Sequence, residues 1–178
     1  GGTGAAKCGG NYAASLIAQM EGEAHGCAQV LFTDPNRDHA VEELGGMNVF
    51  FVFDDDRLVT PELTGTILEG VTRSSIIELA EARGMTVEQR RFTLDEWREG
   101  VRSGHLTEVF ACGTAAVVTP VGELRSAAGT VPAPASMITG LSASPAARST
   151  TSATASETAS TNGAKWPLDR NVSRELTI

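Results

Sequence analysis

The sequence predicts a domain of mixed architecture, of the α+β or α/β class. Stretches with apolar residues at helical spacing alternate with short apolar runs of strand length, and glycines separate them. The chain has 178 residues, of which 41% are hydrophobic, so it is long and apolar enough for a sizeable core. No internal repeat is visible in it.

The first expected element is a helix over 11–24. Tyr12, Leu16 and Met20 recur there at four-residue spacing, and Gly26 is placed to end the helix. Three strands are expected next, at 29–32, 48–54 and 58–60. The middle strand is apolar on both faces, as buried strands are, and three aspartates form the expected hairpin loop between it and the last.

The second half continues the alternation. Thr72 is expected to cap a helix that ends at Ala82. Thr93 or Asp95 is expected to start a shorter helix that ends at Arg102. The remaining strands are expected at 86–92, 107–111 and 115–119, with Cys112-Gly113-Thr114 between the last two.

The composition changes sharply near Ser126. From there to Gly163 the chain is mostly Ala, Ser, Thr, Pro and Gly, which offer few large apolar side chains to offset the cost of ordering. We therefore expect a folded domain at 1–128 and a disordered, low-complexity tail at 129–178. A shift of the reading frame near Thr130 is our hypothesis for this tail, and a natural flexible extension is the alternative.

Charge and cysteine spacing exclude several classes of function. The formal net charge of -8 repels phosphate backbones, so no nucleic-acid partner is expected. No apolar run is long enough to span a bilayer, so no membrane association is expected. Cys8, Cys27 and Cys112 show no CxxC spacing, which is typical of reduced thiols in a cytoplasmic protein and predicts no metal site.

Four short segments stand out by their glycines and polar residues. They are 1–12 (GGTGAAKCGGNY), 42–48 (EELGGMN), 70–73 (GVTR) and 112–116 (CGTAA). In this order they resemble the branched-chain amino acid aminotransferases, which belong to the fold-type IV class of pyridoxal-phosphate (PLP) enzymes. The resemblance covers roughly 1–128, and four ordered matches are much more specific than one. It implies the large C-terminal domain of the fold-type IV, D-amino acid aminotransferase-like fold, in an incomplete form.

The resemblance assigns cofactor-binding roles to three side chains in the first half. Lys7 would be the catalytic amine that holds PLP covalently and moves protons. Glu43 would keep the pyridine nitrogen protonated, so that the ring accepts electrons. Glu42 beside it is expected to be an ordinary exposed acid, since neighbours on an extended strand point to opposite faces. Tyr12 would lie near the phenolic oxygen of the ring, and core packing on the first helix is the alternative.

The other two segments are assigned to the phosphate and to the substrate. N–H groups of Val71 and Thr72, at a helix start, would bind the cofactor phosphate, which the hydroxyl of Thr114 would also reach. N–H groups of Thr114 and Ala115 would bind the carboxylate of the amino acid. Glu69 stands where the family usually has proline, and an acid beside a phosphate is unfavourable, so Glu69 is expected to point away.

The implied activity is PLP-dependent transfer of the amino group between leucine, isoleucine or valine and 2-oxoglutarate, in a cytoplasmic homodimer. One alternative is another fold-type IV enzyme, such as a D-amino acid aminotransferase or an aminodeoxychorismate lyase. The other is an inactive fragment. The family has a smaller domain before the lysine segment, which supplies an arginine for the phosphate and much of the side-chain pocket. The chain from Gly1 onward is therefore expected to be inactive by itself.

Overall fold

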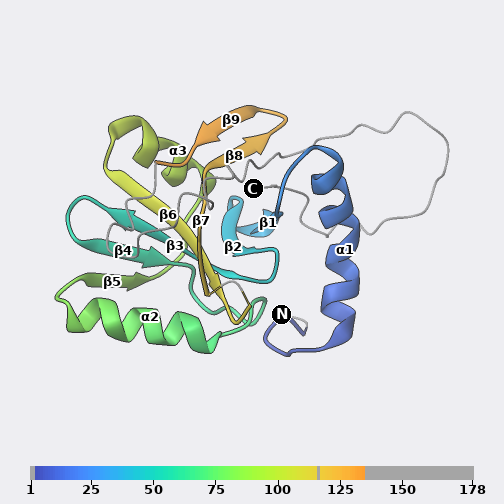
Figure 1. Cartoon of the computed structure of the whole chain (residues 1–178), viewed down its shortest axis with the longest axis horizontal. Coiled ribbons are helices and arrows are strands. Elements are labelled where there is room, and N and C mark those ends of the chain that lie inside the picture. Colours follow the sequence, from blue (N-terminus) through green and yellow to red (C-terminus); the bar gives the residue numbers. More distant parts are fainter. Residues whose placement is uncertain (1–2, 116, 135–178) are drawn as a thin grey trace.

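The computed structural model describes residues 3–115 and 117–134, and its elements form one main sheet, two small sheets and three α-helices (Figure 1). In chain order the elements are α1 (Gly9–Ala24), β1 (Leu31–Asp34), the 3-10 helix η1 (Pro35–Arg37), β2 (Ala40–Leu44), β3 (Asn48–Phe53), β4 (Arg57–Thr60), α2 (Val71–Ala82), β5 (Thr86–Gln89), α3 (Leu94–Ser103), β6 (Leu106–Gly113), β7 (Val117–Pro120), β8 (Glu123–Ser126) and β9 (Gly129–Pro132). The main sheet has the strand order β5-β4-β3-β6-β7, in which only β4 and β5 run parallel. The small sheets are the antiparallel pairs β1–β2 and β8–β9. The predicted mixed class is confirmed.

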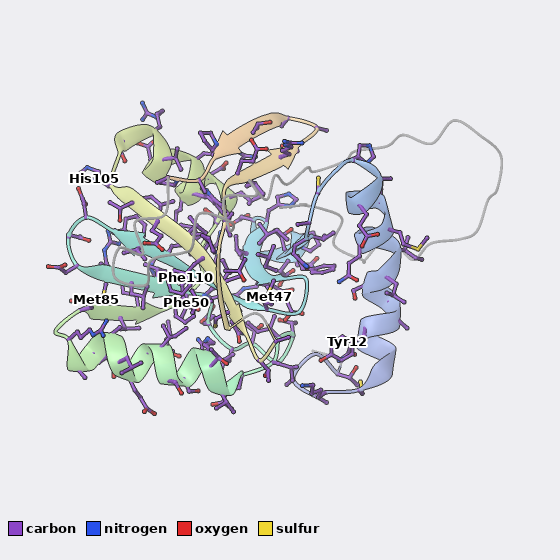
Figure 2. The ribbon with its side chains drawn as sticks, viewed as in Figure 1. Tyr12, Met47, Phe50, Met85, His105 and Phe110 are labelled. Carbon is purple, nitrogen blue, oxygen red and sulfur yellow. The ribbon has the colours of Figure 1, made fainter. Side chains whose placement is uncertain are left out.

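Strand β3 is the middle of the main sheet because its residues are apolar on both faces. Phe50 and Phe51 are fully buried in two different core clusters, as expected for neighbours on a strand. Phe50 stacks on Phe110 of β6 (Figure 2), with 5.1 Å between the ring centroids. It shares its cluster with Ile77 of α2. Helix α2 therefore covers this face of the sheet.

The second core cluster lies on the other face of the sheet and includes residues of α3 and both small sheets. Phe51 stacks on Phe92 at 3.9 Å and meets the ring of Trp97 edge-on at 5.1 Å. Helix α3 begins as predicted: the Thr93 hydroxyl accepts a hydrogen bond from the Glu96 N–H, and the Glu96 carboxylate accepts one from the Thr93 N–H. The small sheets contribute Leu31, Val41 and Leu124 among others.

Helix α1 lies to one side of these layers (Figure 1). No residue of α1 belongs to either core cluster, and Ile17 in its middle is 71% exposed. Leu16 and Met20, which predicted the helix by their spacing, are exposed as well. The apolar stripe of α1 therefore packs against no core within the described residues. None of the described helices is long and apolar enough to cross a membrane.

Strand β9 corrects the expected domain boundary. It lies after residue 128, in the segment expected to be disordered, yet it pairs with β8, and Ala133 beyond it is buried. The folded part therefore extends at least to Pro134. Composition missed the strand because the hydrogen bonds of a hairpin ladder join backbone groups and do not depend on large side chains. Residues 135–178, which hold the rest of the predicted tail, lie outside the described residues.

Candidate functional site

The predicted segments meet at the turn between β2 and β3. A methyl group on Gly46 in this turn would lie 3.9 Å from Cε1 of Tyr12 on α1. A methyl group on Gly113, at the end of β6, would lie 3.2 Å from Cγ of Met47 in the turn. Figure 2 shows Tyr12 pointing from α1 toward the rest of the molecule. The missing side chain of Gly113 thus allows β6 to approach the turn closely, whereas a methyl group on Gly46 would make an ordinary van der Waals contact with Tyr12.

Asn48 joins this turn to the start of α2. It is buried at the beginning of β3, and its Nδ2 donates a hydrogen bond to the carbonyl of Leu68, 3.0 Å away. Its Oδ1 lies so close to Gly70 that a methyl group there would be only 2.2 Å away. Gly70 also has a φ of 71°, which favours glycine. The position where α2 begins is therefore set by Asn48.

The start of α2 differs from the prediction in its cap. Gly70 is the N-cap, with no side-chain cap, and Thr72 is the second residue of the helix, so the predicted capping by Thr72 is wrong. The N–H groups of Val71 and Thr72 lie in the first turn, where N–H groups have no partner inside the helix and attract anions. Val71 is 86% exposed and Glu69 is exposed too, which leaves this helix start accessible.

Lys7 lies on the loop before α1, which we define as the Lys7 loop, residues 3–8. The side chain of Asn11 fixes this loop by donating to the carbonyls of Thr3 and Ala6, at 2.7 and 2.9 Å, and by accepting from the Thr3 hydroxyl at 2.6 Å. Lys7 itself is exposed, and its amine forms no hydrogen bond or ion pair with the described residues. The loop is therefore held in place while the amine stays available.

Glu43 is a partly buried acid on β2, and its carboxyl group accepts no hydrogen bond from the described residues. Burial raises its pKa from the ordinary value of 4.5 to about 7, and the charge of Glu42 contributes. The strand has a bulge here, because Phe32 pairs with Glu43 and Thr33 pairs with Val41, which leaves Glu42 unpaired. Bulges disturb the regular alternation of side chains, so the predicted opposite directions of the two acids do not follow here.

Glu42 is not the ordinary exposed acid that we expected. It is partly buried, and its Oε1 accepts a hydrogen bond of 2.5 Å from the hydroxyl of Thr66. No local sequence signal predicts this hydrogen bond, because Thr66 lies in the loop between β4 and α2, far from β2 in the chain.

Thr114 and Ala115 lie in an exposed turn after β6. The pairing of Asn48 with Cys112 brings this turn close to the start of β3. The hydroxyl of Thr114 has no hydrogen-bonding partner among the described residues, so no hydrogen bond joins it to the start of α2 there.

Two buried polar residues near the site had no predicted role. Asn48 belongs to the second segment, and an asparagine at the head of a buried strand is a signal for a side chain that bonds to the backbone. Arg73 follows Thr72 on α2 and is only 2% exposed. It donates to the carbonyl of Pro61 at 2.9 Å and to Oε1 of Gln89 at 3.1 Å, and so joins α2 to the ends of β4 and β5.

The chemistry of these residues fits PLP. A desolvated carboxyl group that accepts no hydrogen bond from the described residues suits a protonated pyridine nitrogen, whose positive charge would stabilise the ionised form of Glu43. An accessible helix start at Val71 suits a phosphate, and the free amine of Lys7 suits an aldehyde. Among the described residues, no group of three or more His, Cys, Asp or Glu is placed to hold a metal ion.

Comparison with known sequences decides the family. The family model described as amino-transferase class IV matches residues 5–124 of this chain. The chain belongs to the class IV aminotransferases. The match includes Lys7, Glu43 and Thr72, and it ends within β8.

Several curated proteins similar to this chain are branched-chain aminotransferases. The branched-chain-amino-acid aminotransferase of Mycobacterium tuberculosis (strain H37Rv) is 55% identical over 131 residues, which are 72% of this chain and 36% of that protein. The enzyme of Mycolicibacterium smegmatis is 55% identical over 128 residues, 70% of this chain and 35% of that protein. The chain thus spans about a third of the length of these relatives, and the resemblance to their family is confirmed.

Solved structures of branched-chain aminotransferases have the same fold. The Escherichia coli enzyme is 39% identical, with a TM-score of 0.56 over 66% of this chain and 37% of that one. The Thermobaculum terrenum enzyme, solved in its PLP form, is 35% identical, with a TM-score of 0.58 over 67% of this chain and 36% of that one. The predicted fold-type IV architecture, in partial form, is therefore confirmed. The individual residue assignments stay predictions.

Proposed function

We propose that this chain is the PLP-binding part of an aminotransferase that moves an amino group between leucine, isoleucine or valine and 2-oxoglutarate. The observation that carries the proposal is the meeting of the predicted segments at the turn between β2 and β3. Tyr12, Gly113 and, through Asn48, the start of α2 all approach this turn. The 55% identity to branched-chain aminotransferases supports this substrate class over the other fold-type IV enzymes.

In this proposal each site residue has a separate task at the cofactor. PLP, when bound, supplies the electron sink for chemistry at the α carbon of the amino acid. Lys7 holds the cofactor and carries the proton to and from that carbon. Glu43 keeps a proton on the pyridine nitrogen, and Tyr12 lies beside the phenolic oxygen. The desolvated position of Glu43 strengthens its attraction to a positive charge.

Anionic groups are bound by backbone N–H groups in this proposal. Those of Val71 and Thr72 bind the cofactor phosphate at the positive end of α2, and the Thr114 hydroxyl adds a hydrogen bond. The turn at Thr114 and Ala115 binds the carboxylate of the amino acid. These contacts orient the substrate so that its α carbon lies within reach of Lys7.

The oligomeric state and the cellular location of the enzyme are part of the proposal. We infer a homodimer in the cytoplasm, and the free thiols of Cys8, Cys27 and Cys112 are compatible with a reducing compartment. Sedimentation of the purified protein and fractionation of cells that express it test these two points.

The sharpest test of the cofactor site uses the lysine content, because the whole sequence contains only two lysines, Lys7 and Lys165. The chain is incubated with PLP, reduced with borohydride to make the cofactor–lysine link permanent, and mapped by mass spectrometry. We expect the label on Lys7 in the wild type and in Lys165→Arg, and no label in Lys7→Arg. A label that follows Lys165 would refute the assignment of the site.

The substrate class is tested in a protein that carries this chain together with the rest of the length of its relatives. Leucine with 2-oxoglutarate is compared with D-alanine with 2-oxoglutarate. We expect transfer from leucine to exceed transfer from D-alanine by at least about a hundredfold, because a pocket that recognises one arrangement around the α carbon rejects its mirror image. Preference for D-alanine would favour the D-amino acid aminotransferase alternative.

A further inference from the structure

We propose that Glu42 and Thr66 form a positioning pair that holds the Lys7 loop against the strand that carries Glu43. The inference rests on the proposed function, because it concerns how the cofactor lysine is held. Glu42 and Thr66 do not touch the cofactor in this proposal. They act through the backbone segments that they connect.

The first contact joins the Lys7 loop to residues 64–66, which we call the anchor loop. The N–H of Ala5 donates a hydrogen bond of 3.1 Å to the carbonyl of Gly65. Gly4 packs so tightly on the anchor loop that a methyl group there would lie 1.9 Å from the carbonyl oxygen of Thr66. The two loops are therefore in direct backbone contact two to three residues before Lys7.

The second contact joins the anchor loop to β2. The hydroxyl of Thr66 donates to the carboxylate of Glu42 at 2.5 Å, and the hydroxyl oxygens of Thr66 and Thr64 are 2.7 Å apart. A hydroxyl has only one proton to donate, and that of Thr66 goes to Glu42, so Thr64 must donate to Thr66. The bond to Glu42 has an ionised acceptor in a partly buried place, which makes it stronger than a bond between neutral groups.

The position of Glu42 on β2 gives the pair its connection to the cofactor site. Glu42 is the unpaired residue of the bulge, and Glu43 follows it directly. Bulges re-aim side chains, and this one leaves Glu42 bonded to the anchor loop, while the carboxyl group of Glu43 accepts no hydrogen bond from the described residues. Contacts therefore run from Glu43 through Glu42, Thr66 and Ala5 toward Lys7, and they involve three separate chain segments.

No ion pair among the described residues competes with Thr66 for the Glu42 carboxylate. Arg37 is near Glu42, and its charge interacts with it, but the guanidinium group forms its ion pair with Glu62. No salt bridge to Glu42 occurs among residues 3–115 and 117–134. The bond to Thr66 is thus the direct polar contact that the Glu42 carboxylate makes in the described part of the chain.

The first experiment measures the Lys7 loop without cofactor. Hydrogen exchange of the Ala5 amide is compared in the wild type, Thr66→Val and Thr66→Ser, with Thr107→Val as a matched control. Thr107 also donates its hydroxyl, to Val52 at 3.1 Å, but on the main sheet. We expect about tenfold faster exchange in Thr66→Val, from loss of a bond to a charged group, and exchange within about twofold of the wild type in Thr66→Ser and Thr107→Val. Unchanged exchange in Thr66→Val would overturn the proposal.

The second experiment measures the consequence for Lys7. The PLP concentration that gives half-maximal borohydride labelling of Lys7 should rise about tenfold in Thr66→Val and return to the wild-type value in Thr66→Ser. Glu42→Gln keeps an acceptor oxygen without the charge and should lie between them. Faster exchange with unchanged labelling would overturn the positioning role.

The two experiments also separate this proposal from the proposed function. If the wild type is not labelled on Lys7, the proposed cofactor site fails and the positioning role fails with it. The exchange rates would then still decide whether the Glu42–Thr66 contact holds the loop. Tryptophan fluorescence in a Trp166→Phe background, in which Trp97 next to Phe51 is the single tryptophan, verifies that each variant is folded.

Discussion

Helices α1 and α2 both begin at the candidate site, but they are stabilised in different ways. Helix α2 buries Arg73, Ile77 and Ala80 and covers one face of the main sheet. Helix α1 buries only Gly22 and leaves Ile17 at 71% exposure. The comparison shows two ways in which a segment of the candidate site is held in position: by packing of its helix, or by polar contacts of the loop before its helix.

The starts of the two helices show the same contrast. Gly70 is fixed by the close approach of Asn48, a buried residue of the central strand. Before α1, the loop is fixed by hydrogen bonds from the Asn11 side chain and to the carbonyl of Gly65. Because hydrogen bonds in exposed loops open more easily than packed cores, we expect the Lys7 side of the site to be the more mobile one.

The largest expected effect on the free energy of unfolding comes from replacing one isoleucine by alanine in each helix, in two separate variants. Ile77→Ala should lower the free energy of unfolding by about 2–5 kcal/mol, because it leaves a cavity beside Phe50. Ile17→Ala should change it by less than about 0.5 kcal/mol, because its side chain is in solvent. Urea unfolding measures both. Equal losses of unfolding free energy in the two variants would contradict the contrast between α1 and α2, since they would mean that another surface covers α1 in solution.

The second test compares glycine-to-alanine changes at the two helix starts. Gly70→Ala should destabilise the protein by about 2–3 kcal/mol, because φ is 71° and the new methyl group displaces Asn48. Gly9→Ala should be neutral or stabilising by up to about 1 kcal/mol, because a methyl group meets open space in a helical residue. Thermal unfolding of both variants provides the measurement, and a destabilised Gly9→Ala would contradict the open position of α1.

The smallest expected effect concerns Glu43 on β2. Its folded-state pKa of about 7 exceeds the ordinary 4.5, so the folded chain keeps a proton that the unfolded chain loses between these pH values. Stability should therefore fall as pH rises from about 4.5 to about 7, by on the order of 1–2 kcal/mol given the partial exposure of the carboxyl group.

Glu43→Gln is the variant that isolates this effect. It should flatten the dependence of unfolding on pH in that window, whereas Glu81→Gln, at an exposed position of α2, should leave the dependence unchanged. Unfolding in urea at pH 5 and at pH 7 gives the difference. Parallel slopes for the wild type and Glu43→Gln would show that this carboxyl group is not desolvated.

Strong local patterns predicted the elements that the structure confirms. The apolar run of β3 and the Thr93 cap of α3 were both recognisable, because each depends on neighbouring residues. Strand β2 was missed, since Glu42 and Glu43 interrupt its apolar pattern. The cap of α2 was misplaced at Thr72 because the residue that fixes Gly70 is Asn48, which lies far away in the sequence.

The candidate site was predictable only in part. The resemblance named Lys7, Glu43 and the start of α2, but it did not show what holds them in place. The bond between Glu42 and Thr66 joins segments that meet only after the chain has folded, and no local signal marks it. The exposed stripe of α1 was also unpredictable, because periodicity shows that a helix has an apolar face and does not show what covers it.

The pairing of β3 with β6 has a consequence for the order of folding. Asn48 and Cys112 are register partners, although β4, α2, β5 and α3 all lie between them in the chain. Closing so long a loop is entropically costly and is compensated only when the strands are joined, so this pairing should be a slow step. Helix α1, which contributes to neither core cluster, has no part in that step. The turn at Gly113 reaches Met47 only after β3 and β6 have joined, so the candidate site should form late, after the central sheet.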